Sequence, residues 1–532
     1  MPRPIRAAGV TLLASLLAAT PVHAQRTTQS GNAPKLIVFV AVDQMRADYF
    51  ERFLPQLNGG LGRLYRHGAV FTNAYQDHAI TETAPGHSVM LSGRFPAHTG
   101  IVTNSLGVPD PQAPLIGGGG DGASPFRFRG TVLIDWLRMN DPRSRALSVS
   151  RKDRGAILPM GRAHQNAFWY ATDGRFTTST YYADTLPTWV QRFNARKIPQ
   201  SYAGKAWTLL LPASSYPEAD SLPFENYRKD FVFPHAFPSD PAKTASTFMN
   251  YPVMDSLIAQ IALEGVVATN LGAGPQTDLL SLSFSTTDAI GHAFGPDSRE
   301  LHDQIVRLDR YMGAFIDSLY KLRDSSTIAF ALTADHGVQP SADLRALREH
   351  IAPMRADVTT PLNTAREAMR TAGAKGDPIR FEEGVVLLQR PSLAGTKLNA
   401  DSVLKALAAS LRKVTGVAQV DFVKDLARAD TVKNYAARRW LHMLPSDFSA
   451  DLVISLAPYA FYTGDIVATH GSPNDLDAHV PEIFYGPWFT PGKYAQRALV
   501  ADIAPTLAAI AEVSPSEKLD GRARTEVLRK RR

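Results

Sequence analysis

Several stretches of the sequence carry side chains suited to metal binding and phosphoryl transfer, beginning with Thr83. In the segment Thr83-Ala-Pro-Gly-His87, Ala-Pro-Gly predicts a helix start, so the threonine hydroxyl stands at the positive end of that helix. Because helix starts favour phosphate-like anions, Thr83 is a candidate nucleophile for phosphoryl transfer. Taken alone, the segment is equally compatible with an ordinary turn before a buried helix.

Aspartate and histidine side chains follow three predicted strands, over residues 35–42, 278–284 and 327–333. The first run is continuously apolar after Lys35, as expected of a strand buried on both faces of a parallel sheet, and we interpret the other two as further strands of that sheet. Ligands collect at the carboxyl ends of strands in open α/β sheets, so we expect these side chains to lie close together. Asp43, taken by itself, would also suit a cap of the following turn. The residues concerned are Asp43 after the first strand, Asp288 and His292 after the second, and Asp335 and His336 after the third.

These side chains form a larger set of donors with Thr83 and with His470, which stands in Thr-His470-Gly-Ser-Pro. Mixtures of carboxylate and imidazole suit zinc, and the set is too large for one tetrahedral ion but fits two. Two ions roughly 4 Å apart clamp the entering and leaving oxygens of an in-line phosphoryl transfer. Manganese or magnesium at one of the sites is also compatible. The predicted ligands of two Zn²⁺ ions are Asp43, Thr83, Asp288, His292, Asp335, His336 and His470.

The elements that must position these residues predict an α/β fold with a mostly parallel central sheet. Apolar, β-rich runs alternate with helical patterns, among them a long amphipathic helix after His292. Two ranges break this alternation, near 160–275 and 341–450, and we interpret them as insertions that cap the site. The core is expected to resume with a strand over 451–455.

Composition and the first residues indicate an exported globular protein. The chain has 532 residues, 44% of them hydrophobic, so it can bury a large core. Residues 1–24 resemble a cleaved signal peptide, with Arg3 and Arg6 before an apolar run that is shorter than the roughly 20 residues of a membrane span. An uncleaved anchor is the alternative. We expect a bacterial periplasmic or secreted protein with a mature domain over residues 25–532 and no stable membrane anchor.

The cysteine count and the charge exclude other classes of site and partner. The sequence has no cysteine, which excludes disulfides, thiolate metal ligands and a lipid on an N-terminal cysteine. Much of the net charge of +7 lies in the tail over residues 522–532, which is more typical of a solvated end than of a nucleic-acid patch. We therefore expect no nucleic-acid partner.

The ordered motifs resemble those of the alkaline phosphatase superfamily, and within it the threonine-nucleophile phosphatases of PafA type, relatives of the type I phosphodiesterases and nucleotide pyrophosphatases. Each motif alone is weak, but the set in this order is specific and spans most of the mature chain. The resemblance implies a three-layer α/β/α sandwich with inserted cap segments. The motifs are Val-Asp43-Gln-Met-Arg, Thr83-Ala-Pro-Gly-His, Asn104, Lys152-Asp-Arg154, Asp288-x-x-Gly-His292, Asp335-His336-Gly and Thr-His470-Gly-Ser-Pro.

The same resemblance implies a role for each motif residue. One zinc would be held by Asp288, His292 and His470, and a second by Asp43, Asp335, His336 and the oxygen of Thr83. Thr83 would attack phosphorus and form a phosphothreonine, since metal binding lowers the pKa of its hydroxyl. Asn104, Lys152 and Arg154 would bind the non-bridging phosphate oxygens.

Lys152 and Arg154 decide the expected substrate, although by themselves they are also compatible with a solvated loop. A phosphate monoester is largely a dianion at neutral pH and a diester a monoanion, so two extra cations favour the monoester. We expect an alkaline phosphatase of broad specificity that acts, as a monomer, on small-molecule phosphate monoesters.

The same residues bear on three other functions. A phosphodiesterase or nucleotide pyrophosphatase of the same superfamily is the alternative. Thr83-Ala-Pro-Gly-His does not fit the motif of sulfatase-type relatives. A non-catalytic binding protein would require a lost ligand or nucleophile, and none of the motif residues is missing.

Overall fold

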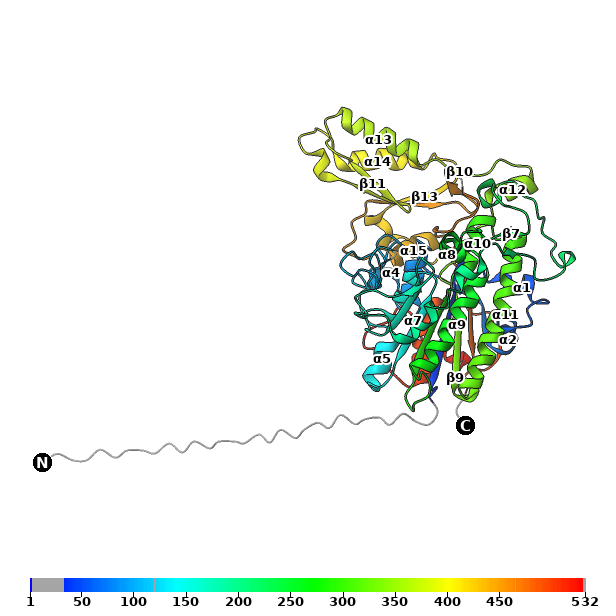
Figure 1. The fold of residues 1–532 in the computed structure, drawn as a ribbon. Helices are drawn as coiled ribbons and strands as arrows, with labels where there is room; N and C mark the ends of the chain where they lie inside the picture. Colours follow the sequence, from blue (N-terminus) through cyan, green and yellow to red (C-terminus); the bar gives the residue numbers. More distant parts are fainter. Residues whose placement is uncertain (2–32, 119, 465, 530–532) are drawn as a thin grey trace.

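The computed structural model describes Met1 and residues 33–529, apart from residues 119 and 465 (Figure 1). The predicted signal segment therefore lies, Met1 excepted, outside the described residues. Among the described helices, none is by itself both long and apolar enough to cross a membrane. One pair, 241–250 and 253–268, meets these criteria jointly, but it is bent by 90° at the break.

A ten-stranded sheet forms the centre of the molecule, in the order β17-β2-β16-β9-β1-β8-β3-β4-β5 with β18 beside β2. The strands β9, β1, β8, β3 and β4 run parallel, whereas β16 is antiparallel to both of its neighbours. The fold is therefore α/β with a mostly parallel sheet, as predicted. The bounds are β1 (Leu36–Val42), β2 (Ala69–Tyr75), β3 (Ala146–Ser150), β4 (Asn166–Tyr170), β5 (Phe176–Thr177), β8 (Asp278–Phe284), β9 (Ile328–Thr333), β16 (His479–Tyr485), β17 (Gly492–Tyr494) and β18 (Ala498–Leu499).

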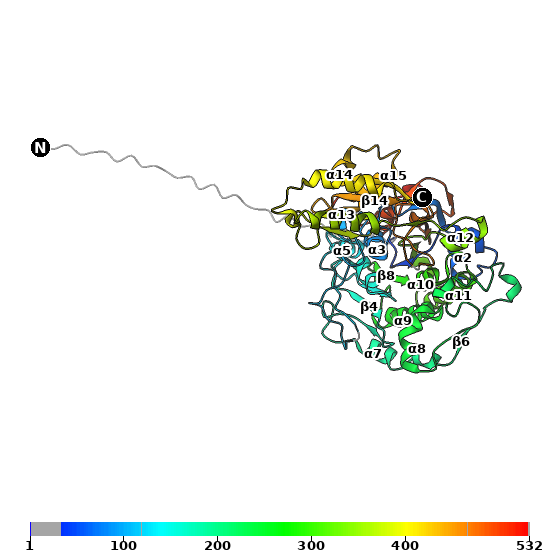
Figure 2. The same cartoon turned by 90° about the horizontal axis from the view of Figure 1, so that it is seen from above.

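Helices cover both faces of this sheet, so the central body has three layers. In Figure 2, α9, α10 and α11 lie on one side of β8, and α3 and α5 on the other. The strands β1, β8 and β9 between these layers are buried on both faces, as expected of strands in a parallel sheet. The bounds are α2 (Gly60–His67), α9 (Val253–Ala268), α10 (Thr286–Phe294) and α11 (Arg299–Leu322) in the first layer, and α3 (Thr83–Met90), α5 (Leu133–Asn140), α6 (Asp153–Ile157) and α17 (Ile503–Ala511) in the second.

Strand register aligns the carboxyl ends at which the site residues were expected. In β1, Val42 lies opposite Phe284 of β8, and Ala41 lies opposite Thr333 of β9. Since Val42, Phe284 and Thr333 are the last residues of their strands, the segments that follow all begin at the same edge of the sheet.

The range 160–275 is not a single insertion. Strand β4 pairs with β3 in the central sheet, β5 pairs with β4, and α9 packs on β3 and β8. Both ends of the range thus complete the central body, and only the stretch between β5 and α9 lies outside the sheet. The sequence alone did not distinguish these elements of the central body from an insertion. Strand β4 contains the large aromatic residues Phe168, Trp169 and Tyr170, which are equally compatible with a strand and with a packed loop.

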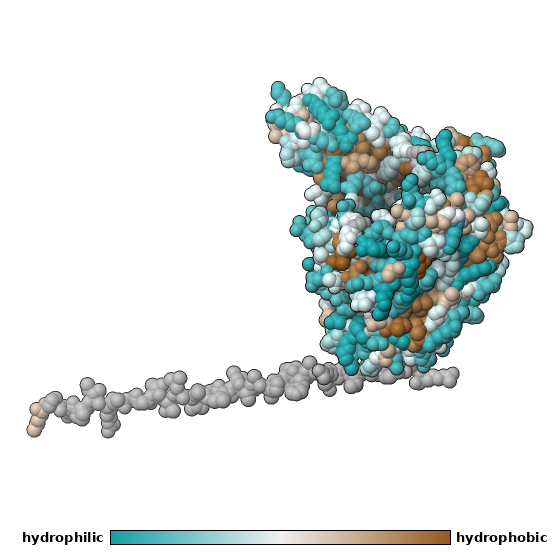
Figure 3. Space-filling model, in the orientation of Figure 1, coloured by the Kyte–Doolittle hydropathy of each residue, from teal (hydrophilic) through white to brown (hydrophobic). Residues whose placement is uncertain are grey.

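Within the range 341–450, residues 359–422 form most of a smaller unit above the central body in Figure 1, which also stands out in the space-filling view of Figure 3, whereas α15 (Tyr435–Met443) packs on α4 (Pro96–Thr99) of the body. The four-stranded sheet of this unit has the order β11-β12-β14-β13 and packs against two helices. We call this unit the small subdomain: β11 (Ile379–Glu382), β12 (Val385–Leu388), β13 (Val417–Phe422), β14 (Leu452–Leu456), α13 (Thr359–Thr371) and α14 (Ala400–Leu411).

Strand β14 corrects the expectation that the core resumes at 451–455. It pairs antiparallel with β12 and β13 and belongs to the small subdomain. Its five residues are all buried, and a fully buried apolar strand has the same sequence pattern in either sheet. The central sheet resumes only with β16.

The position of β14 can be tested by local stability. Ile454→Ala should leave a cavity in the core of the small subdomain, at a cost of about 2–5 kcal/mol. Hydrogen exchange should then accelerate in β11, β12 and β13 but not in β1, β8 and β9. The matched variant Ile483→Ala, in the central core, should destabilise the central sheet instead. Faster exchange of the central sheet in both variants would contradict this division.

Candidate active site

Two carboxylates leave the ends of β1 and β9 and are held in place by neighbouring donors. The Ser283 hydroxyl donates to Asp43 Oδ1 at 2.9 Å. The backbone N–H groups of Gln44 and His336 each donate to Asp335 Oδ1 at 3.0 Å. The second oxygens are also buried: Asp43 Oδ2 lies 3.0 Å from Lys152 Nζ, and Asp335 Oδ2 lies 3.4 Å from ring nitrogens of His87 and His336. Each carboxylate therefore keeps one oxygen suited to a cation.

Helix α10 places Asp288 and His292 one turn apart on the same face, and His470 meets them from a distant part of the chain. Asp288 Oδ1 lies 3.3 Å from His292 Nε2 and 3.6 Å from His470 Nε2. The two Nε2 atoms are 3.1 Å apart. The opposite ring nitrogens donate to backbone carbonyls, of Ala468 at 3.0 Å and of Thr81 at 2.7 Å. These bonds turn both Nε2 atoms towards Asp288, the usual arrangement of metal-binding histidines.

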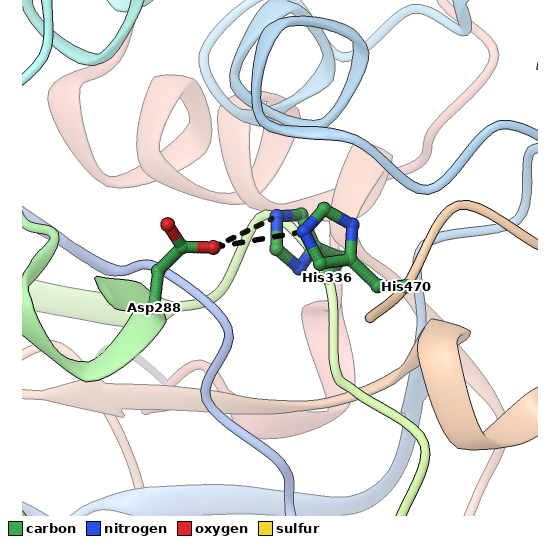
Figure 4. A group of neighbouring side chains, drawn as sticks. All are labelled: Asp288, His336 and His470. Carbon is green, nitrogen blue, oxygen red and sulfur yellow. Dashed lines mark ion pairs between the residues drawn. The ribbon is translucent and has the colours of Figure 1, made fainter. Parts of the chain in front are cut away.

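His336 lies between the two groups. Its Nδ1 donates to the Gly337 carbonyl at 3.0 Å, while its Nε2 lies 3.4 Å from Asp335 Oδ2 and 4.0 Å from Asp288 Oδ1. Figure 4 shows His336 and His470 side by side and facing Asp288, and their ring centroids are 3.5 Å apart. Burial lowers the pKa of both histidines, and their mutual proximity adds to this effect at His336. The imidazoles are therefore neutral, which is the form that binds metal.

Thr83 is the first residue of α3, and its buried hydroxyl meets Lys152. Lys152 Nζ donates to Thr83 Oγ1 at 3.1 Å and lies 2.7 Å from Asp288 Oδ2 and 3.0 Å from Asp43 Oδ2. Burial would raise the pKa of Asp288, but Lys152 and His292 hold that pKa well below its ordinary value. One ammonium group thus joins the candidate nucleophile to carboxylates of both candidate metal groups.

The other two predicted phosphate-binding residues differ in how closely the structure brings them to Thr83. Asn104 folds back to the start of α3, as expected: its Oδ1 accepts from the Ala84 N–H at 2.9 Å, and its own N–H donates to Glu82 Oε2 at 2.7 Å. Arg154 lies on α6, 3.5 Å from Asp153, and makes no hydrogen bond to Thr83 within the described part of the chain. Its role in phosphate binding stays a prediction.

His87 is a site residue that sequence reasoning did not assign, although it stands in the same motif as Thr83. Its Nδ1 lies 2.9 Å from the Thr83 carbonyl and 3.4 Å from Asp335 Oδ2, and its Nε2 lies 3.5 Å from Asp43 Oδ1. Burial would lower the pKa of His87, but the two carboxylates raise it. The spacing of four residues from Thr83 could have indicated it, because such residues share a helix face.

The donor set fits two metal ions in composition and placement. Two groups bring their ligand atoms within 4.8 Å of one another: Asp288 with His336 and His470, and Asp43 with His87 and Asp335. The buried carboxylate oxygens, and the imidazoles of His336 and His470, whose pKa values are lowered, are ligands that zinc accepts. His336 falls in the first group, so its expected assignment to the second ion stays a prediction.

The arrangement as a whole suits phosphoryl transfer. A hydroxyl at a helix start, a lysine ammonium and two potential cation sites converge at one edge of the sheet, where a phosphate dianion would be stabilised. Tight packing fixes this edge: a Cβ on Gly86 of α3 would stand 2.3 Å from the Asp335 carbonyl oxygen.

Comparison with known proteins gives one family. The sequence matches the family model of the type I phosphodiesterases / nucleotide pyrophosphatases over residues 37–472. Alkaline phosphatase PhoV of Synechococcus elongatus is 32% identical, over 93% of this chain and 93% of the relative. Alkaline phosphatase PafA of Elizabethkingia meningoseptica is 29% identical, over 97% of this chain and 98% of the relative.

Solved structures agree with the sequence comparison. The crystal structure of wild-type alkaline phosphatase PafA matches with a TM-score of 0.86 and 28% identity, over 93% of this chain and 99% of that one. Murine ectonucleotide pyrophosphatase / phosphodiesterase 5 shares the fold, with a TM-score of 0.53 at 14% identity. The predicted alkaline phosphatase-like fold is therefore confirmed. The chain belongs to the type I phosphodiesterase / nucleotide pyrophosphatase family, and its similarity to PafA and PhoV over nearly its whole length confirms the resemblance to PafA-type alkaline phosphatases.

Proposed function

We propose that this protein is an exported, zinc-dependent alkaline phosphatase that hydrolyses phosphate monoesters of broad structure through a phosphothreonine intermediate. Its class, a phosphoric monoester hydrolase, follows from relatives of nearly equal length that are alkaline phosphatases. One observation carries the finer proposal: Lys152 Nζ bonds to Thr83 Oγ1 while it contacts Asp43 and Asp288. The candidate nucleophile, the candidate phosphate-binding cation and potential metal ligands thus lie in contact with one another inside the protein.

Different residues of the site would carry out different parts of the reaction. Bound zinc ions, held by the carboxylates and imidazoles of the site, would supply positive charge that lowers the pKa of the Thr83 hydroxyl and neutralises the leaving oxygen. The Thr83 oxygen would then attack phosphorus as the ester bond breaks. Lys152 is placed to neutralise charge on the phosphoryl oxygens, and water would release phosphate from the phosphothreonine.

The alternative is a phosphodiesterase or nucleotide pyrophosphatase, the class for which the matching family model is named. The family model does not separate the two, because both reactions need the same metal set. Lys152 favours the monoesterase, since its ammonium adds a positive charge beside the nucleophile that a dianionic phosphate uses better than a monoanionic one.

The assigned nucleophile is tested by Thr83→Ala. Turnover of an aryl phosphate should fall below detection, because Thr83 carries the hydroxyl at the first residue of α3, while the Thr81 hydroxyl, two residues earlier, is bonded to the Ser472 carbonyl. Elemental analysis should still find about two zinc ions per chain, since six other ligands remain. Thr360→Ala, on the small subdomain, is the control and should keep wild-type turnover. Turnover near wild type in Thr83→Ala would refute the assignment.

The monoesterase proposal is tested with one aryl monoester and the matching diester. Wild-type protein should prefer the monoester, and Arg154→Ala should lower kcat/KM for the monoester by at least about tenfold, the usual effect of losing a charged hydrogen bond. The kcat/KM value for the diester should fall much less. Lys397→Ala is the matched control, because it also removes one positive charge, at an exposed residue between β12 and α14. A wild-type preference for the diester would favour the alternative function.

Export is proposed from the first 24 residues. Protein recovered from its native compartment should begin at Gln25, which N-terminal sequencing measures directly. Arg3→Glu/Arg6→Glu should slow processing, because the positive start of a signal peptide is needed for its orientation. Recovery of the chain with residues 1–24 intact in the membrane fraction would instead support the uncleaved anchor.

A further inference from the structure

One buried residue, Thr81, makes three hydrogen bonds to the segment that carries the candidate metal ligand His470. The His470 Nδ1–H donates to the Thr81 backbone carbonyl at 2.7 Å. The Thr81 hydroxyl donates to the Ser472 carbonyl at 3.0 Å and accepts from the Gly471 N–H at 3.1 Å. Thr81 is fully buried, so its carbonyl and hydroxyl would find no solvent to replace these partners. Three successive residues of the His470 segment are therefore fixed to one residue.

Thr81 is also joined tightly to the start of α3, where the candidate nucleophile stands. The Glu82 N–H donates to the Ile80 carbonyl at 2.9 Å, which closes a γ-turn with Thr81 at its centre. Thr83, two residues after Thr81, is the first residue of α3. A displacement of Thr81 would therefore move the His470 ring relative to the Thr83 hydroxyl.

The other contacts of the His470 segment lead to different parts of the chain. Ser472 donates from its N–H and its hydroxyl to Asp477 Oδ2, at 3.0 and 2.6 Å. The Gly337 N–H donates to the Asp477 carbonyl at 2.6 Å, so this side of the segment is connected to the residues that follow β9. Within the described residues, every hydrogen bond from residues 470–472 to the segment before α3 is made by Thr81.

We propose that Thr81 is a positioning residue that holds the zinc ligand His470 in place relative to the nucleophile Thr83. The inference rests on the proposed function, which assigns those two roles. The bond to the Thr81 carbonyl leaves His470 Nε2 directed at Asp288 Oδ1, 3.6 Å away. Such bonds orient metal-binding histidines, and their loss typically weakens metal binding or activity by about 10–100-fold. The Thr81 hydroxyl supports the same geometry, because it fixes the backbone that follows His470.

The test replaces the Thr81 hydroxyl by a methyl group, since Thr81→Val keeps the shape of the side chain. The matched control is Thr506→Val on α17, a helix that carries none of the candidate site residues. The Thr506 hydroxyl is equally buried, donates to the Asp502 carbonyl at 2.6 Å and accepts from the Arg524 N–H at 2.9 Å. Each variant loses one donated and one accepted bond, so a comparable fall in Tm is expected of both.

Zinc affinity, measured by competition with a chelator, needs no substrate. Thr81→Val should bind one of its two zinc ions at least about tenfold more weakly than wild type and the other with wild-type affinity, because His470 belongs to one of the two candidate groups. Turnover of an aryl phosphate should fall by a similar factor. Thr81→Ser, which restores the hydroxyl, should recover both values, and Thr506→Val should keep them. Wild-type zinc affinity in Thr81→Val, or equal weakening of both ions, would overturn the proposal.

Hydrogen exchange of the metal-free protein separates this inference from the proposed function. In Thr81→Val, amide exchange should accelerate about tenfold both in residues 470–475 and in the first turn of α3, whereas Thr506→Val should leave both segments at the wild-type rate. This result would support the positioning role even if the wild-type protein bound no zinc and hydrolysed no monoester. Wild-type exchange in either segment of Thr81→Val would overturn it, even in an active zinc enzyme.

Discussion

The contact of one buried lysine with two aspartates and a threonine is the interaction on which the site depends. Parallel strands that end together bring Asp43 and Asp335 to one edge, and α10 adds Asp288, so negative charge accumulates away from water. Buried charges are costly unless they are paired or bind metal. Lys152 Nζ, within 3.0 Å of carboxylate oxygens of Asp43 and Asp288, offsets part of this charge and also reaches the Thr83 hydroxyl. The side chain that balances this charge is therefore also the one that contacts the candidate nucleophile.

Backbone packing determines where these groups can stand. Helix α3 lies so close to the end of β9 that Gly86 has no space for a Cβ, and this approach sets the Thr83 hydroxyl beside the strand-end carboxylates. His87, four residues after Thr83, contacts Asp43 and Asp335 from the same helix. The second hydrogen bonds of His292 and His470 go to backbone carbonyls, so ring orientation also follows from the backbone path. The positions of these side chains therefore follow largely from the backbone at this edge of the sheet.

The sequence was most informative where a long apolar strand ended on a polar residue. Asp43, Asp335 and the Asp288 group could be expected at one edge for this reason, since strands buried on both faces are typical of parallel sheets, in which ligands collect at the carboxyl ends of the strands. It was least informative where the same pattern suits two places. The apolar residues of β14 fit either sheet, and the aromatic residues of β4 fit a strand or a loop. Which sheet a strand joins, or whether a segment forms a strand at all, depends on contacts between distant segments, and a local sequence pattern does not contain this information.

The candidate catalytic groups and the cavity beside them come from parts of the chain with different packing. The candidate ligands Asp43, Asp288, Asp335 and His336 and the Thr83 hydroxyl are buried at strand ends and helix starts, where a shift of one backbone segment would displace several of them. Short elements between β5 and α9, outside the sheet, line a cavity beside Asp288 and His292 and include the exposed ring of Tyr227. Arg151 is where the two parts meet, because it precedes Lys152 in the chain and lines the cavity beside Asp288.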